Sequence, residues 1–122
     1  MSIRVSKISG DIWSIALGGR IDSAVARAVE EAFNNLSESG HHRVVVDFTE
    51  ATYLASAGIR VLIMAQRRAQ TAGGGVQLAG AITNIEDVMR MAGLEQMFIF
   101  NKSVGEAVGR LMGGGGSADE AG

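Results

Sequence analysis

Residues 44–72, VVVDFTEATYLASAGIRVLIMAQRRAQTA, combine two different hydrophobic patterns. The first five residues, VVVDF, form a short β-branched run of the kind found in strands that are covered on both faces. After residues 49–55, apolar side chains recur at the three- and four-residue spacing of a helix, and three glycines follow at 73–75. This stretch therefore predicts a central strand over residues 44–48, a loop, and a helix over residues 56–72.

The segments on either side continue this alternation of strand and helix patterns. Residues 3–8 and 12–17 are apolar runs separated by the turn formers Ser9-Gly10-Asp11, which predicts a hairpin. Helical spacing of apolar residues predicts a helix over residues 22–37, with Asp22 as its N-cap. The same two patterns further along the chain predict a strand at 76–80, a helix at 82–92, a strand at 97–100 and a helix at 104–111.

Strands that alternate with helices require right-handed parallel crossovers, and the initial hairpin adds one antiparallel strand. The expected fold is therefore α/β: a single mixed, mostly parallel β-sheet with four helices and an antiparallel N-terminal edge strand. We expect the folded domain to span residues 1–112. The Gly-rich residues 113–122 can bury almost no apolar surface, so we expect them to form a flexible tail.

The composition narrows the classes of function. The 122 residues are 47% hydrophobic, which is enough for the core of one domain. Eleven Lys and Arg against thirteen Asp and Glu give a net charge of −2, which argues against a nucleic-acid partner held by phosphate contacts. The absence of cysteine excludes disulfides and thiolate metal sites, and it fits a reducing cytoplasm. We expect no membrane span, because no apolar run is long enough.

Ligands of parallel sheets usually bind where the loops after the strands gather beside helix N-termini. Three such loops are expected, at residues 18–22, 49–58 and 80–84. The middle loop holds Ser56 between two alanines, so its hydroxyl should be reachable at the start of a helix. The hydroxyl is either the N-cap of that helix or a regulated group, on which a phosphoryl group would gain from free amides and the helix dipole. The two roles are compatible.

Several short segments follow one another in a recognisable order. They are GRID at 19–22, VVVDFT at 44–49, YLASAGI at 53–59, AGGGVQL at 72–78, and MAGL at 91–94 followed by Met97-Phe98. Their order and spacing, rather than any single segment, resemble the STAS domain of anti-sigma factor antagonists. The resemblance covers residues 3–111.

The resemblance implies a binding protein rather than an enzyme. In that family a short Asp-Ser-Ser/Thr/Ala-Gly motif opens the second helix, and a partner that is both a GHKL-type serine kinase and an anti-sigma factor phosphorylates the first serine. Matched to this motif, Ser56 is the phosphorylated serine and Gly58 the glycine. The unphosphorylated protein should bind the anti-sigma factor and free the sigma factor, and the phosphorylated protein should release it. The expected partner-binding residues are Asp22, Ala55, Ser56, Ala57, Gly58 and Arg60.

A serine phosphatase is a further partner that the resemblance implies, the expected location is the cytoplasm, and no cofactor or metal is expected. The sequence departs from the family motif at Ala55, where the family usually has an aspartate that could cap the helix, orient the serine or be recognised by the kinase. This departure favours an alternative, a STAS accessory subunit of a lipid-transport ATPase or a signalling scaffold in which Ser56 is not modified.

Other polar residues suggest alternatives. Asp47, at the end of the central strand, could be the phosphoacceptor of a response-regulator receiver, but the acidic pair that would hold Mg²⁺ is missing, so we expect it to cap the following loop. Because His41 and His42 are adjacent and cannot converge on one ion, we expect a solvated turn. Asp22 should cap the first helix, with contact to a nucleotide or a partner as the alternative. The arginines of the second predicted helix should form a solvated face, with partner docking as the alternative: Arg60, Arg67 and Arg68.

Overall fold

The computed structural model describes residues 2–114. They form a five-stranded sheet in the order β1-β2-β3-β4-β5, with β1 antiparallel to β2 and the other neighbours parallel, which confirms the predicted fold class. The strands are β1 (Ser2–Ser9), β2 (Ile12–Ile21), β3 (Arg43–Leu54), β4 (Gly75–Ala79) and β5 (Phe100–Asn101). The helices are α1 (Ser23–Glu38), α2 (Ser56–Thr71), α3 (Thr83–Met91) and α4 (Val104–Gly109), with a 3-10 turn η1 (Leu94–Gln96) and a π turn η2 (Arg110–Gly114).

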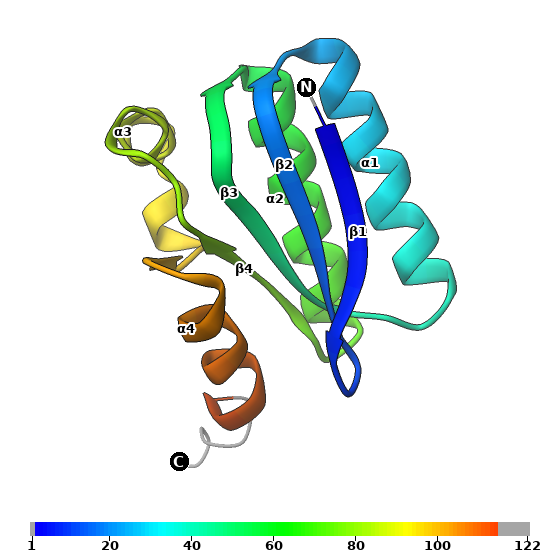
Figure 1. Ribbon diagram of the computed structural model, residues 1–122. Coiled ribbons are helices and arrows are strands. Elements are labelled where there is room, and N and C mark those ends of the chain that lie inside the picture. Colours follow the sequence, from blue (N-terminus) through cyan, green and yellow to red (C-terminus); the bar gives the residue numbers. More distant parts are fainter. Residues whose placement is uncertain (1, 115–122) are drawn as a thin grey trace.

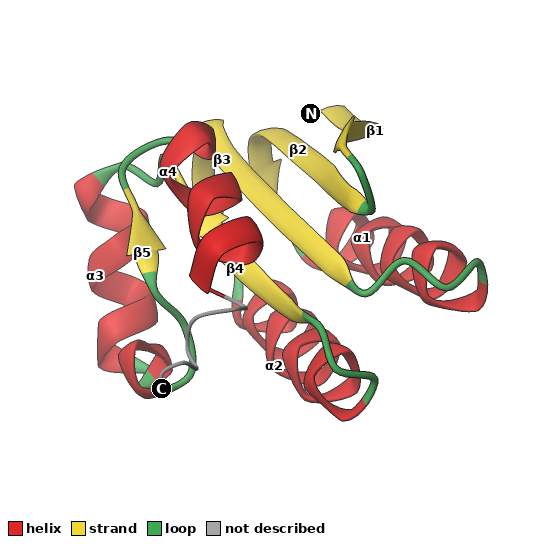
Figure 2. Ribbon diagram, turned by 90° about the horizontal axis from the view of Figure 1, so that it is seen from below, coloured by secondary structure: helices red, strands yellow, loops and turns green. Residues whose placement is uncertain are grey.

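The sheet is covered by helices on both faces, as Figures 1 and 2 show: α1 and α2 lie side by side on one face and α4 packs on the other. Because side chains alternate along a strand, Val44 and Val46 face the α1 and α2 layer while Val45 faces α4. All three are at most 2% exposed. This two-sided burial explains the uninterrupted valine run and confirms β3 as the central strand.

Strands β2 and β3 are longer than the sequence predicts. Residues 18–21 and 49–54, expected as loops, pair with each other as the ends of these strands, with two register shifts along the way. Strand β4 pairs with β3 only as far as Asp47 opposite Ala79, so beyond that point β3 has no neighbour on one side and tolerates exposed polar residues. The polar composition of this segment is therefore a property of an edge, and the loop prediction was wrong.

The region after α3 also differs from the prediction. Residues 97–99, expected to be strand, follow the turn η1, and the amides of Met97 and Phe98 both donate to the Leu94 carbonyl oxygen at 2.9 Å. Strand β5 is consequently reduced to two residues. Strand β4 ends at Ala79, and the next residue, Gly80, has a φ of +75°, a backbone conformation that favours glycine.

The helical structure at the C-terminal end of the described residues continues two residues into the segment expected to be a flexible tail. Helix α4 is followed directly by η2, which includes Gly113 and Gly114, the first two residues of the expected tail. Residues 115–122, which make up the rest of that tail, lie outside the described residues. No helix within residues 2–114 has the length and apolar character needed to cross a membrane.

Candidate functional site

The carboxyl ends of β2 and β3 meet at one edge of the sheet, at the top of Figure 1, and α1 and α2 begin there. The last residues of the two strands, Ile21 and Leu54, are register partners, and the Ala55 amide donates to the Ile21 carbonyl oxygen at 2.9 Å. The third expected segment approaches as well, because a Cβ on Gly80 would lie 2.5 Å from the Thr49 hydroxyl oxygen. We call this region the Ser56 edge: residues 20–22, 49–60 and 80–84.

Helix α1 begins at the Ser56 edge with a side-chain cap. Asp22 has an extended backbone, with φ −88° and ψ −171°, and its carboxylate accepts a hydrogen bond from the Val25 amide at 3.0 Å. This confirms Asp22 as the N-cap of the first helix. Its side chain is exposed at the edge, so the cap does not prevent contact with a partner.

Helix α2 begins in a different way, and here one expectation was wrong. The N-cap is Ala55, with φ −83° and ψ 162°, and it offers no side-chain cap. Ser56 is the first helical residue, one position too late to serve as the cap. Its side chain is exposed, and its hydroxyl makes no hydrogen bond within the described part of the chain. In this structure Ser56 is therefore not the N-cap of α2, and its side chain is exposed to solvent.

The start of α2 is fixed by close packing on the strand ends. Gly58 is buried, and a Cβ at this position would lie 2.7 Å from Leu54 Cδ1 and 3.4 Å from Ile21 Cγ2. A branched side chain at this position would push the first turn of the helix away from β2 and β3. Ala57, by contrast, is half-buried, and Arg60 is exposed one turn further along. Gly58 thus shapes the surface that presents Ser56, while Arg60 adds a positive charge to it.

The structure adds two residues that the sequence reasoning missed. The guanidinium carbon of Arg20 lies 4.1 Å from the centre of the Tyr53 ring, which is a cation–π contact between the paired ends of β2 and β3. Both residues lie in segments already quoted for the family resemblance, but their pairing depends on two register shifts that no residue pattern reveals. Arg20 therefore stands on the Ser56 edge as a second exposed cation.

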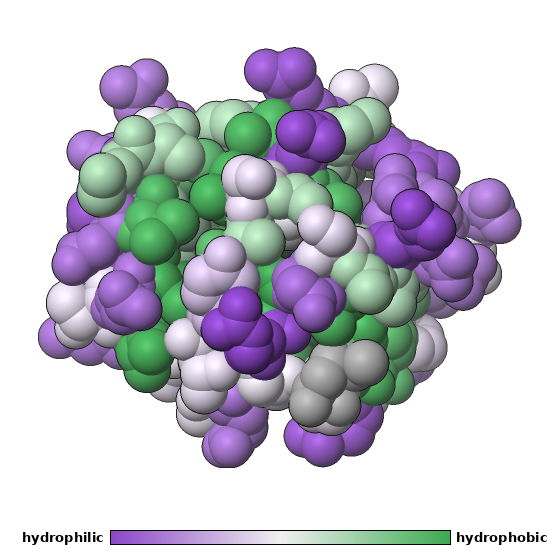
Figure 3. All heavy atoms as spheres, turned by 90° about the horizontal axis from the view of Figure 1, so that it is seen from above, coloured by the Kyte–Doolittle hydropathy of each residue, from purple (hydrophilic) through white to green (hydrophobic). Residues whose placement is uncertain are grey.

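Figure 3 looks down on the Ser56 edge. Apolar and weakly polar residues gather over much of its middle, and strongly hydrophilic residues are most frequent around its rim. Two large apolar side chains of this edge are well exposed, Tyr53 at 38% and Ile82 at 44%. An apolar centre with a polar rim is the usual composition of a surface that binds another protein.

The other polar residues singled out in the sequence, Asp47, His41 and His42, have structural roles in this fold. The Asp47 carboxylate accepts from the Thr49 amide at 2.9 Å and from the Thr49 hydroxyl, so it stabilises a register shift inside β3 rather than a loop. His41 and His42 are half-buried rather than solvated, and His41 stacks on Trp13 with ring centres 4.7 Å apart. Over residues 2–114, no group of three or more His, Cys, Asp or Glu could hold a metal ion.

The comparisons with known proteins agree with this geometry. RsfB of Mycobacterium tuberculosis, an anti-sigma-F factor antagonist, is 26% identical over 101 residues, which cover 82% of this chain and 81% of RsfB. BtrV of Bordetella bronchiseptica is 26% identical over 98 residues, which cover 80% of this chain and 84% of BtrV. The unphosphorylated form of the Bacillus anti-sigma factor antagonist SpoIIAA superimposes with a TM-score of 0.80 at 15% identity, over 91% of this chain and 96% of SpoIIAA.

The structure of SpoIIAA in its phosphorylated form also superimposes, with a TM-score of 0.73 at 15% identity, over 89% of this chain and 98% of SpoIIAA. At this level of identity the two superpositions establish the shared fold. The family itself follows from a sequence match: the family model described as "Mlab, STAS domain" matches residues 7–101. The chain therefore belongs to the STAS domain family.

Proposed function

We propose that this protein is an anti-sigma factor antagonist whose Ser56 edge binds an anti-sigma factor. One observation carries the proposal: the edge presents an exposed serine hydroxyl without a hydrogen-bond partner in the described structure. The motif resemblance assigns this serine to the position of the family's regulated serine. The exposed apolar side chains beside it provide contact area for a protein partner. The relatives that carry the antagonist function in their names match over most of this chain.

Phosphorylation of Ser56 switches this binding off. The partner, a serine kinase of the GHKL type, transfers the γ-phosphoryl group of ATP to Ser56 Oγ. The new bond joins phosphorus to Oγ, the bond to the bridging oxygen of ADP breaks, and the hydroxyl proton passes to a base of the kinase. The phosphate brings about two negative charges to the first turn of α2. Carrying them into a closed interface costs free energy, so the partner is released.

Residues on both helix starts contribute to the proposed interface. Asp22, Ala55 and Ala57 lie at the adjacent starts of α1 and α2. Buried Gly58 contributes by seating the first turn of α2, and Arg60 supplies a charge that steers the partner. A serine phosphatase reverses the switch. The proposal places the protein in the cytoplasm, where sigma factors act, and assigns it no catalytic residue of its own.

The test begins with capture of the partner from native lysate by the full chain, followed by calorimetry with the purified partner. Ser56→Ala should bind about as well as the wild type, and Ser56→Asp should bind at least tenfold more weakly, or about 1.4 kcal/mol. Ser6→Asp places the same charge on exposed β1 away from the edge and should leave the affinity unchanged. Equal affinities of Ser56→Ala and Ser56→Asp for the partner would show that Ser56 lies outside the interface and would contradict the proposal.

Modification is tested separately. Incubation with the captured kinase and ATP should add one phosphate to the protein, and Ser56→Ala should abolish it. Intact-mass and peptide analysis locate the group. Phosphate on Ser103 instead, or none with an active kinase, would contradict the assignment.

One structural feature favours a second candidate function. The residue that usually carries a carboxylate in this motif is Ala55, so α2 begins without a side-chain cap and a kinase has one recognition group fewer. In this alternative the chain is an accessory subunit of a lipid-transport ATPase, or a signalling scaffold, and Ser56 is not modified. Capture of a transporter ATPase instead of a GHKL-type kinase would support this alternative.

A further inference from the structure

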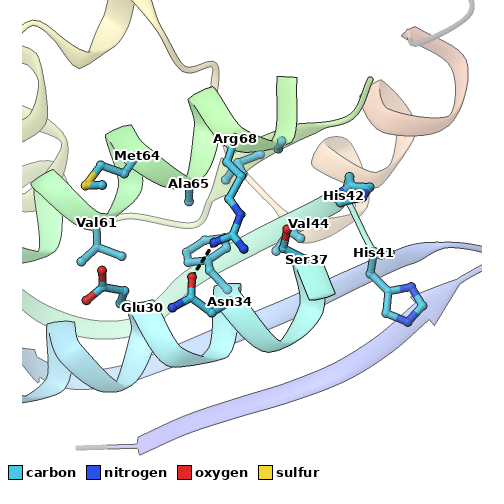
Figure 4. Close-up of a pocket in the computed structure, with 13 residues that line it drawn as sticks. Glu30, Asn34, Ser37, His41, His42, Val44, Val61, Met64, Ala65 and Arg68 are labelled. Carbon is cyan, nitrogen blue, oxygen red and sulfur yellow. Dashed lines mark hydrogen bonds between the residues drawn. The ribbon is translucent and has the colours of Figure 1, made fainter. Parts of the chain in front are cut away.

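A second concave site lies between α1 and α2, separate from the Ser56 edge. Figure 4 shows this cavity, which has a volume of about 200 Å³. Apolar side chains form its floor and walls, contributed by both helices and by β3: Phe33, Val44, Val61 and Ala65. We call it the interhelical cavity. An apolar cavity of this size favours an apolar ligand, because water inside it would find few hydrogen-bond partners.

The polar groups of the interhelical cavity are unevenly distributed. Arg68 reaches from α2 across the opening, and its guanidinium donates a hydrogen bond to the Asn34 side-chain oxygen on α1 (Figure 4). His41 and His42 lie on one side of this Arg68–Asn34 pair, and the Glu30 carboxylate lies on the other side, beside Val61. None of the ion pairs within residues 2–114 involves Arg68. The middle of the cavity opening therefore holds a cation whose partner is neutral.

We propose that the interhelical cavity binds a small carboxylate with an apolar body. The apolar part lies over Phe33 and Ala65. The carboxylate replaces the Asn34 oxygen as the partner of Arg68, since a carboxylate brings an opposite charge and can accept two parallel hydrogen bonds from a guanidinium, whereas the amide oxygen is neutral. Size limits the class further. A protein cavity of about 150 Å³ holds benzene, so this cavity accepts one aromatic ring or a comparable alkyl group with a short acid chain.

This function goes beyond docking at the Ser56 edge, but one helix serves both sites. The first residue of α2 that lines the cavity is Val61, five residues after Ser56, which corresponds to about 7.5 Å along the helix axis, and Ser56 is not part of the lining. A ligand in the cavity therefore does not touch Ser56, and its binding is measured without the protein partner. The two failures are therefore distinguishable: absence of ligand binding tests the cavity, and absence of partner binding tests the Ser56 edge.

The probe is 3-phenylpropionate, titrated into the full-length protein and followed by amide chemical shifts in NMR. Shifts should concentrate on residues 30–42 and 61–69, and 3-phenylpropan-1-ol, which has the same apolar body without the charge, should bind at least tenfold more weakly. Trp13, the only tryptophan, stacks on His41 at the rim of the cavity, so its fluorescence gives a second signal. Absence of binding, shifts centred elsewhere, or equal affinity for acid and alcohol would overturn the proposal.

Matched variants separate the charge from the cavity. Arg68→Gln should weaken binding of the acid at least tenfold and leave the alcohol unchanged, while Arg67→Gln, at an exposed neighbour outside the cavity, should change neither. Ala65→Leu should fill the cavity and weaken both ligands, and its NMR spectrum shows whether the fold is kept. If Arg67→Gln weakens the acid as much as Arg68→Gln does, the attraction is a general surface charge effect and the proposal fails.

Discussion

Helices α1 and α2 start side by side at the same sheet edge, yet their first turns are held in different ways. Asp22 caps α1 with its own carboxylate, which accepts from the Val25 amide. Helix α2 has alanine at the equivalent position and no side-chain cap. What holds it is the packing of Gly58 against Leu54 and Ile21, together with the backbone hydrogen bond from Ala55 to Ile21.

This difference has a functional consequence. A capped helix start uses a side chain to satisfy one of its free amides, whereas an uncapped start leaves those amides to water or to a bound group. No side chain caps the amides beside Ser56, although the Gly58 amide donates to the Ala55 carbonyl oxygen at 2.9 Å, whereas in α1 the Asp22 side chain caps the Val25 amide. A negatively charged group on Ser56 is therefore favoured at the start of α2, where no side chain carries a charge. At the start of α1 such a group would be repelled by the Asp22 carboxylate.

Substitution of Gly58 should have the largest effect on this arrangement. Gly58→Val adds a branched side chain where even a Cβ would lie 2.7 Å from buried Leu54 Cδ1, so overpacking should lower the free energy of unfolding by about 2 kcal/mol. Denaturant unfolding measures this. Gly58→Ala is the control: the tip of Leu54 can rotate away, and alanine favours a helix by about 1 kcal/mol over glycine. Equal losses for both variants would contradict the packing explanation.

Removal of the existing cap should come second. Asp22→Ala leaves the Val25 amide without its acceptor, and the free energy of unfolding should fall by about 1 kcal/mol. Asp22→Asn keeps an oxygen in the same place and should stay close to the wild type. If both variants lose the same amount, the negative charge rather than the cap stabilises α1.

The sequence predicted the layers of this fold better than the details of its edge. Helical spacing of Val25, Val29 and Phe33 was sufficient for α1, because each of these side chains is buried against the sheet. The VVV run predicted the central strand for the same reason. Burial of one face of a helix or strand produces a periodic hydrophobic pattern in the sequence, and this pattern predicts the element without a structure.

The details of the Ser56 edge could not be predicted from hydrophobic periodicity. Whether a residue is the cap or the first helical residue depends on its backbone angles, so the hydroxyl of Ser56 suggested a cap that the structure assigns to Ala55. The contact of Arg20 with Tyr53 requires two register shifts, which leave no pattern of their own. The interhelical cavity likewise depends on how far apart two helices pack, which spacing within one helix does not specify.

Addition of the missing cap should have a smaller effect in the opposite direction. Ala55 already has the extended backbone of an N-cap. In Ala55→Asp the new carboxylate should accept a hydrogen bond from a first-turn amide of α2 and raise the free energy of unfolding by about 0.5 to 1 kcal/mol. Denaturant unfolding measures this gain, and Ala55→Asn supplies the cap without the charge. The same Ala55→Asp variant should be phosphorylated faster on Ser56 if the kinase recognises the carboxylate. No gain from either variant would show that water or packing already satisfies the first turn.

Ser56→Ala should have the smallest effect and is the sharpest test of the free hydroxyl. Because the side chain is exposed and makes no hydrogen bond in the described structure, its removal should change the free energy of unfolding by less than about 0.5 kcal/mol. Ser103→Ala is the matched comparison: Ser103 is the true N-cap of α4, its hydroxyl oxygen accepts from the Glu106 amide at 3.1 Å, and its loss should cost about 1 kcal/mol. Both are measured by denaturant unfolding. A loss at Ser56 as large as that at Ser103 would mean that the hydroxyl does cap α2 in solution, and a phosphoryl group there would have to break a stabilising contact instead of meeting an open helix start.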